Sequence, residues 1–208
     1  FTNRWLPHFR YLHRLIGEGY IGRCLSAEFR QIGGYGRNGG YHWRFDRKRS
    51  LGILGDLGSH NIDLARWFVG DIAAVSAHLG VCYERRGSDG AVVDSANDSA
   101  LLLMEFANGC HGVMNVSAVA HIGDKIMEPG LVLHGESGTL ELEANLKDGY
   151  KLYGAKRDED TLSALRVPED ILDGVDLELP LMELWAKVFT EQATGCRSFI
   201  QAIAADRK

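Results

Sequence analysis

The stretch that decides the fold is SANDSALLLMEF-ANG-CHGVMNVSAVA, residues 95–120. Its two ends, 95–106 and 110–120, are runs of strand-forming sequence, and Asn108-Gly109 between them is a dipeptide typical of a tight hairpin turn. Two long strands joined by a tight turn pair antiparallel. This segment therefore predicts an antiparallel sheet in the middle of the chain.

Working outward from this hairpin, the sequence predicts further strands and, at the two ends of the chain, helices. The predicted strands are 21–32, 72–83, 131–133, 139–142 and 150–153. Apolar residues at helical spacing predict helices at 7–18, 54–68, 181–194 and 199–206, and the polar segment 155–180 reads as a loop. In strand 21–32 the alternation sets Leu25, Ala27 and Phe29 on the face opposite Cys24. The fold class is α+β: an open-faced, mainly antiparallel sheet with helices on one face.

Composition narrows the class of protein. The 208 residues suffice for one large domain, and 45% apolar residues suffice for a core. The formal charge is −5 with no dense basic cluster, so we expect no nucleic-acid partner. There is no long apolar run, no signal peptide and no C-x-x-C pair among the four cysteines. We expect a cytoplasmic protein without membrane contact, whose cysteines are buried free thiols, and a chain that is part of a longer protein.

A literal G-x-G-x-x-G occurs from Gly34 to Gly39 after a predicted strand. This fingerprint binds a dinucleotide only where a helix N-terminus follows to receive the pyrophosphate. The residues after it, Tyr41-His-Trp43-Arg44, carry no helical apolar stripe. We therefore interpret it as a flexible surface loop, and the alternative is that it lines a cleft through Trp43 and Arg44.

The segment from Gly52 to Gly70 carries the chemistry. Asp56 and His60 are four residues apart, so on a helix their side chains share a face, and Asp63 and Trp67 continue that stripe. A carboxylate beside a histidine fixes its tautomer, as a general acid or base requires. A helix cap at Asp56, a surface role for His60 and half of a metal site are the alternatives. No third ligand has persuasive spacing, so we expect no metal.

The same string, G-x-L-x-D-x-G-x-H-x-x-D-x-x-x-W-x-x-G, resembles the signature of the C-terminal domain of the Gfo/Idh/MocA family, which is named after glucose–fructose oxidoreductase, inositol dehydrogenase and a rhizopine-catabolism protein. Five weaker matches occur in the family's order: NRWLP at 3–7, EGYIG at 18–22, YHWR at 41–44, GESGTL at 135–140 and FIQAI at 199–203. The resemblance thus covers nearly the whole chain.

This resemblance implies an NAD(P)-dependent oxidoreductase acting on the CH–OH group of a sugar, polyol or related small molecule. It gives His60 the role of acid/base and makes Asp56 the residue that orients His60 and the substrate. Arg4, Trp43 and Arg44 are expected to contact substrate or cofactor. The family's N-terminal dinucleotide-binding domain, with its Gly-rich fingerprint and its Lys of the "EKP" motif, is absent from the chain. We therefore expect residues 1–208 to be the C-terminal substrate and oligomerisation domain, inactive alone, with NAD or NADP bound mainly by the absent domain.

Two other functions compete with this one. The first is a non-catalytic oligomerisation module, because helices cover only one face of the predicted sheet and an uncovered apolar face usually finds a partner. The open face is expected to form a homo-oligomer under either hypothesis. The second is a metal-dependent hydrolase or isomerase with Asp56 and His60 as ligands.

Overall fold

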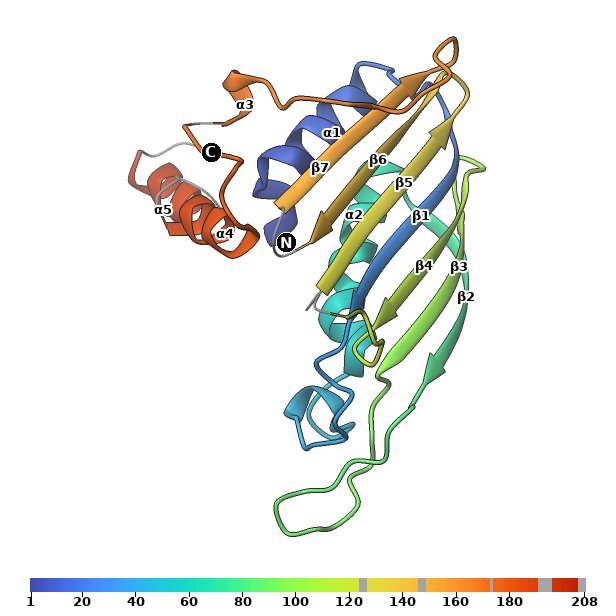
Figure 1. Cartoon of the computed structure of the whole chain (residues 1–208), viewed down its shortest axis with the longest axis vertical. Helices are drawn as coiled ribbons and strands as arrows, with labels where there is room; N and C mark the ends of the chain where they lie inside the picture. The colour runs from blue at the N-terminus through green and yellow to red at the C-terminus, as the bar shows by residue number, and fades with distance from the viewer. Residues whose placement is uncertain (124–126, 146–148, 173, 191–195, 206–208) are drawn as a thin grey trace.

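A computed structural model describes residues 1–123, 127–145, 149–172, 174–190 and 196–205 of the chain. Its centre is one eight-stranded sheet in the order β2-β3-β4-β1-β5-β6-β7-β8 (Figure 1). Only β1 and β4 run parallel among the described strands, so the prediction of a mainly antiparallel sheet is confirmed. The strands are β1 (Cys24–Gly33), β2 (Ile72–Gly80), β3 (Ser99–Phe106), β4 (His111–Ser117), β5 (Met127–Gly135), β6 (Gly138–Asn145), β7 (Gly149–Lys156) and β8 (Ser163–Ala164).

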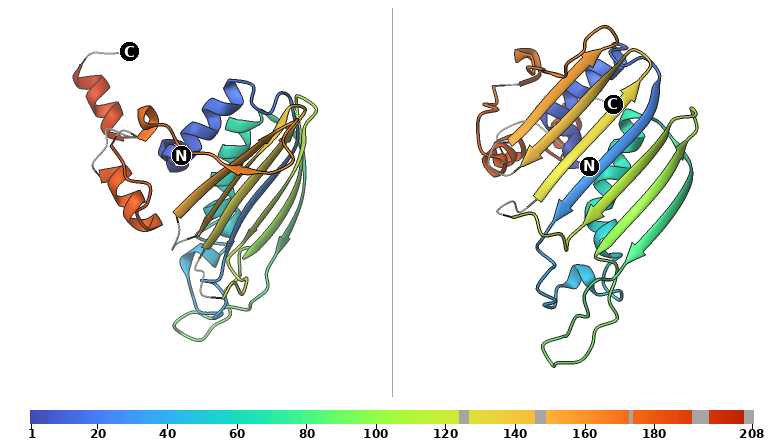
Figure 2. Two further views of the ribbon diagram at one scale, coloured as in Figure 1. Left: turned by 45° about the horizontal axis from the view of Figure 1, so that its top comes forward. Right: turned by 45° about the vertical axis from the view of Figure 1, so that its right-hand side comes forward.

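Two helices, α1 (Pro7–Gly17) and α2 (Ser59–Phe68), lie along one face of this sheet (Figures 1 and 2). On this face α1 contacts β7, and α2 contacts β1. Pro7 occupies the first turn of α1, where its missing N–H costs no hydrogen bond. The inward side chains of β3 and β4, such as Leu102 and Met114, form the core with these helices.

The C-terminal helices α3 (Glu169–Leu172), α4 (Leu181–Thr190) and α5 (Cys196–Ala204) lie beyond the β7 end of the sheet (Figure 2). α4 contacts β7 through a buried stripe that includes Leu184 and Val188. The predicted helices over 181–194 and 199–206 are confirmed within the described residues, and positions 191–194 and 206 lie outside them.

No described helix covers the opposite face of the sheet (Figure 2). We call this side the open face. Its outward side chains include Leu101, Leu103 and Val113, of which Leu103 is 62% exposed. Leu103 and Val113 are register partners on β3 and β4, so they form a continuous apolar strip. The predicted open-faced α+β architecture is thereby confirmed.

Four local predictions need correction. A register shift between Cys24 and Ser26 breaks the alternation of β1, so Leu25 is exposed although Ala27 and Phe29 are buried. The predicted loop 155–180 contains β8 and α3, which are too short to show a sequence period. Residues 95–98 precede β3 and are not part of it. Cys24 and Cys110 are buried free thiols as predicted, whereas Cys82 is exposed, and the side chain of Cys196 lies outside the described part.

No helix within the described ranges combines the length and apolar character needed to cross a membrane.

Candidate active site

The predicted helix over 54–68 begins at Gly52 and contains a π-helical turn, η3 (Leu54–Gly58), before α2. Such turns insert one extra residue and frequently occur at functional sites. The turn holds two glycines, Gly55 and Gly58, where an added Cβ would lie 2.7 Å from the side chains of Leu51 and Leu54. The small residues therefore permit the widened turn that carries Asp56.

The Asp56 carboxylate is held by two donors from outside its helix. Arg44 Nε lies 2.9 Å from Asp56 Oδ2, and Tyr35 Oη donates to the same oxygen at 3.2 Å. Arg44 belongs to η2 (Trp43–Phe45), and Tyr35 lies in the loop after β1. Both donors act on one carboxylate oxygen, so they fix the orientation of the group. Arg44, one of the predicted contact residues, is thus part of the site through Asp56, and Tyr35 is a site residue that sequence analysis missed.

His60 lies one turn further along the helix and is half-buried. Its Nδ1 is buried and has no hydrogen-bond partner among the described residues. The ring of Phe1 packs edge-on against it with 5.2 Å between centroids. Burial lowers the pKa of His60, and the nearby charges of Asp56 and Asp63 oppose that shift by raising it. Burial therefore favours the neutral imidazole, the form that can accept a proton.

The direct contact expected between Asp56 and His60 is not formed in the described structure. The π-helical turn separates them from ordinary i,i+4 spacing, and Asp56 bonds instead to Arg44 and Tyr35. The two residues still share one helix segment, and the charge of Asp56 acts on the imidazole. Their coupling is electrostatic.

Arg4 contacts the helix that carries His60 through Asp63 and Trp67, so its side chain is engaged within the chain. Its guanidinium donates two hydrogen bonds to Asp63, at 2.7 and 2.8 Å, and lies 5.1 Å from the centroid of the Trp67 ring. His13 stacks on Trp67 at 4.3 Å. Arg4 therefore ties η1 (Thr2–Trp5) to α2 at the edge of the site.

Trp43 is 46% exposed, so it is not a core residue. Arg44 lies over its ring, with 4.7 Å to the centroid, and His42 stacks beside it. The exposed indole and the Arg44–Asp56 pair place the segment 42–44 next to the helix that carries His60. Among the residues that the structure describes, no group of three or more His, Cys, Asp or Glu side chains is arranged to hold a metal ion.

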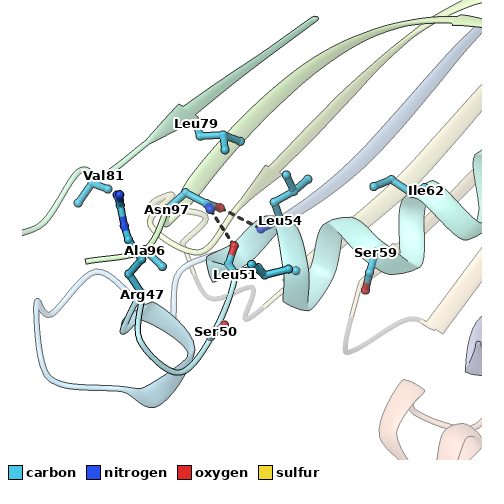
Figure 3. Close-up of a pocket in the computed structure, with 11 residues that line it drawn as sticks. Arg47, Ser50, Leu51, Leu54, Ser59, Ile62, Leu79, Val81, Ala96 and Asn97 are labelled. Atoms are coloured by element: carbon cyan, nitrogen blue, oxygen red, sulfur yellow. Dashed lines mark hydrogen bonds between the residues drawn. The ribbon is translucent and has the colours of Figure 1, made fainter. Parts of the chain in front are cut away.

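A pocket of about 570 Å³ lies on another flank of the same helix (Figure 3). Its walls are mainly apolar and include Leu54, Ile62 and Leu79, and neither Asp56 nor His60 lines it. Asn97 forms part of the wall and holds the start of the helix. Its Oδ1 accepts from Leu54 N–H at 3.0 Å, and its Nδ2 donates to Leu51 C=O at 2.8 Å.

The glycine-rich loop Gly34 to Gly39 does not fit a dinucleotide. It is followed by the three-residue helix η2, which offers no long helix N-terminus for a pyrophosphate. Its backbone instead packs on the chain after β4: Gly36 N–H donates to Ala118 C=O at 2.8 Å. The interpretation as a loop is correct, but the loop is anchored and reaches the site through Tyr35 and Arg44.

Comparison with known proteins identifies the domain type. Residues 9–141 match the model of the GFO/IDH/MocA C-terminal domain. An uncharacterized oxidoreductase of Synechocystis sp. is 29% identical over 163 residues, which is 74% of this chain and 43% of the relative. Levoglucosan dehydrogenase of Pseudarthrobacter phenanthrenivorans is 27% identical over 71% of this chain and 42% of its own length. D-apiose dehydrogenase of Rhizobium rhizogenes is 26% identical over 72% and 39%.

A solved structure of levoglucosan dehydrogenase in complex with NADH and levoglucosan has the same fold, with a TM-score of 0.82 and 24% identity. The likeness covers 99% of this chain and 56% of that one. The chain spans about two fifths of the length of the curated relatives it matches.

Proposed function

The chain belongs to the GFO/IDH/MocA C-terminal domain family, and on this premise we propose that it is the substrate-binding and catalytic part of an NAD(P)-dependent oxidoreductase. The substrate class is a sugar, polyol or related small molecule with a reacting CH–OH group. The observation that carries the proposal is a half-buried His60 one turn away from a carboxylate fixed by Arg44 and Tyr35.

In this proposal His60 is the proton acceptor during alcohol oxidation. The hydroxyl proton must leave as the carbinol carbon gives up a hydride, and a base whose pKa lies near the working pH takes it efficiently. Burial lowers the pKa of His60 and so favours the neutral imidazole, and the charge of Asp56 favours the imidazolium that forms. Asp56 also offers a fixed acceptor for a substrate hydroxyl. Arg4, Trp43 and Arg44 border this position as contacts for substrate or cofactor.

The dinucleotide is assigned to a domain outside this chain. The glycine-rich loop does not fit a pyrophosphate, and the matched relatives are more than twice as long as the matched region. When bound, NAD or NADP supplies the hydride acceptor. Residues 1–208 then form the C-terminal substrate and oligomerisation domain, inactive without its N-terminal partner. The buried free thiols of Cys24 and Cys110 fit a cytoplasmic protein.

We assign the open face to a homo-oligomer. Leu101, Leu103 and Val113 form an exposed apolar strip on neighbouring strands. An apolar patch of this kind marks an interaction site when it is contiguous. A non-catalytic oligomerisation module would use the same face, so the face does not distinguish the oxidoreductase from the module. Variants of the site residues are needed to distinguish them.

The test is turnover by the complete gene product on a panel of sugars and polyols that includes levoglucosan and D-apiose, with NAD and with NADP. We expect His60→Gln to lower kcat/KM by about 10²–10⁴, because it removes the proton acceptor while retaining polarity and size. The control is His134→Gln, an exposed histidine on β5. Turnover within a few-fold of wild type in His60→Gln would favour the non-catalytic module, and a stoichiometric metal in the purified protein would favour the hydrolase.

A further inference from the structure

The Gly34-Tyr35-Gly36 segment contributes one side chain to the candidate site, Tyr35, which donates to Asp56. Both glycines are required by close approach to the chain after β4. An added Cβ would lie 2.8 Å from Ala120 C=O at Gly34 and 3.1 Å from Ala118 C=O at Gly36. The segment is therefore pressed against the sheet, with Tyr35 as its one side chain.

A buried arginine holds the underside of this loop. Arg85 is 1% exposed and donates to Gly36 C=O at 3.0 Å, to Gly40 C=O at 3.2 Å and to Asp98 Oδ2 at 3.2 Å. Its guanidinium also lies 4.0 Å from the centroid of the Phe45 ring. One cation thus anchors the loop on both sides of the turn that follows Tyr35.

This anchoring presents Tyr35 to the site. Its ring stacks on Phe45 with 6.0 Å between centroids, and its hydroxyl donates to Asp56 Oδ2. Burial and the adjacent Asp56 raise the pKa of Tyr35, so the hydroxyl stays protonated and remains a donor at neutral pH. Arg44 occupies the same carboxylate oxygen, and no hydrogen bond to Asp56 Oδ1 occurs among the described residues.

We propose that Tyr35 is a positioning residue of the active site: with Arg44 it fixes the Asp56 carboxylate through Oδ2 and leaves Oδ1 for a substrate hydroxyl. This inference rests on the proposed function for its substrate, but the positioning of Asp56 is a property of the chain itself. The titratable and charged groups that face Asp56 are Tyr35 and Arg44 from the loop and His60 from its own helix. Tyr35→Phe keeps the ring stack and removes one of the donors to Asp56.

The matched control is Tyr41→Phe. Tyr41 donates to Asp46 Oδ2 at 3.2 Å, the same distance as in the Tyr35–Asp56 bond, and it lies in the same part of the chain without touching Asp56. The measurement is the ¹³C chemical shift of the Asp56 carboxyl at neutral pH, assigned with Asp56→Asn. The carboxyl carbon responds when a hydrogen-bond donor to its own oxygen is removed.

We expect Tyr35→Phe to move the Asp56 carboxyl resonance and to lower kcat/KM by about 3- to 10-fold, the cost of one hydrogen bond, and Tyr41→Phe to change neither. An unmoved Asp56 resonance in Tyr35→Phe, or an equal change in the control, would overturn the proposal. The NMR measurement needs no turnover. Its failure is therefore separate from a failure of the proposed function, which the His60→Gln measurement detects.

Discussion

Gly52 sits where the chain enters the helix that carries Asp56 and His60. Its φ is +72°, and an added Cβ would lie 2.3 Å from Asn97 C=O. Asn97 itself holds this entry through its hydrogen bond to Leu54. We expect Gly52→Ala to lower the free energy of unfolding by ~2–5 kcal/mol, from left-handed strain and overpacking together. Urea unfolding measures this loss.

Gly19 is the matched control for this substitution. Its φ is +81°, but nothing lies within 4 Å of an added Cβ. Gly19→Ala therefore carries only the backbone strain, about 1–2 kcal/mol. If Gly52→Ala and Gly19→Ala lowered the free energy of unfolding equally, the close approach of Gly52 to Asn97 would not contribute to stability.

Helical spacing singles out candidate site residues only where they lie close together in sequence. Asp56 and His60 stand out because four residues separate them on one helix. Tyr35 and Asn97 could not, because their contacts with the helix cross 21 and 43 residues of chain and follow no local period. The π-helical turn was missed for a related reason: an apolar stripe shows that a helix is present but not where one residue is inserted.

The loop between β1 and η2 depends on the buried Arg85–Asp98 pair. Both side chains are almost fully buried, and Asp98 also accepts from the backbone N–H groups of Cys82 and Tyr83. Removing one partner leaves the other as an uncompensated buried charge. We expect Arg85→Met to cost about 3–5 kcal/mol of unfolding free energy and the Arg85→Met/Asp98→Asn double variant to cost less than the sum of the two single variants.

The control is a solvent-exposed ion pair of the same protein, Arg23–Glu136. Arg23 and Glu136 are both exposed and lie 2.8 Å apart, so Arg23→Met should cost less than about 1 kcal/mol. Urea unfolding of the single and double variants gives the coupling energy. Additive losses at Arg85 and Asp98 would show that the pair does not act as a unit.

Elements with a clear period were well predicted, and this loop was not. The helix α1 and the hairpin β3–β4 match their predicted positions to within a few residues because their apolar spacing is local. The loop carries no period, and arginine is so rarely buried that sequence alone could not select Arg85 as its anchor. A flexible loop was the prediction, and an anchored one is found.

The whole molecule shows the same limit. Strands in the middle and helices at the ends suffice to predict an α+β fold with one covered face. The strand order places β1 between β4 and β5, including a parallel β1–β4 pair. This pairing joins residues 85 positions apart, such as Ser26 and His111, and no local sequence pattern encodes a contact over that separation.

The open face is the surface through which we expect two copies of the chain to associate. If Leu101, Leu103 and Val113 are buried between two copies, a charge among them must be desolvated without a partner. We expect Leu103→Glu to weaken self-association by about 100-fold, measured as the association constant in sedimentation equilibrium. Leu51→Glu is the control, because Leu51 is 79% exposed and lies beside the pocket near the helix entry, away from the open face. A wild-type protein that stays monomeric at all concentrations would refute the oligomer. Dissociation by Leu51→Glu but not by Leu103→Glu would instead place the interface on the side of the sheet that carries the helices. Leu51 and Leu79, two exposed residues that line the pocket there, would then contact the partner.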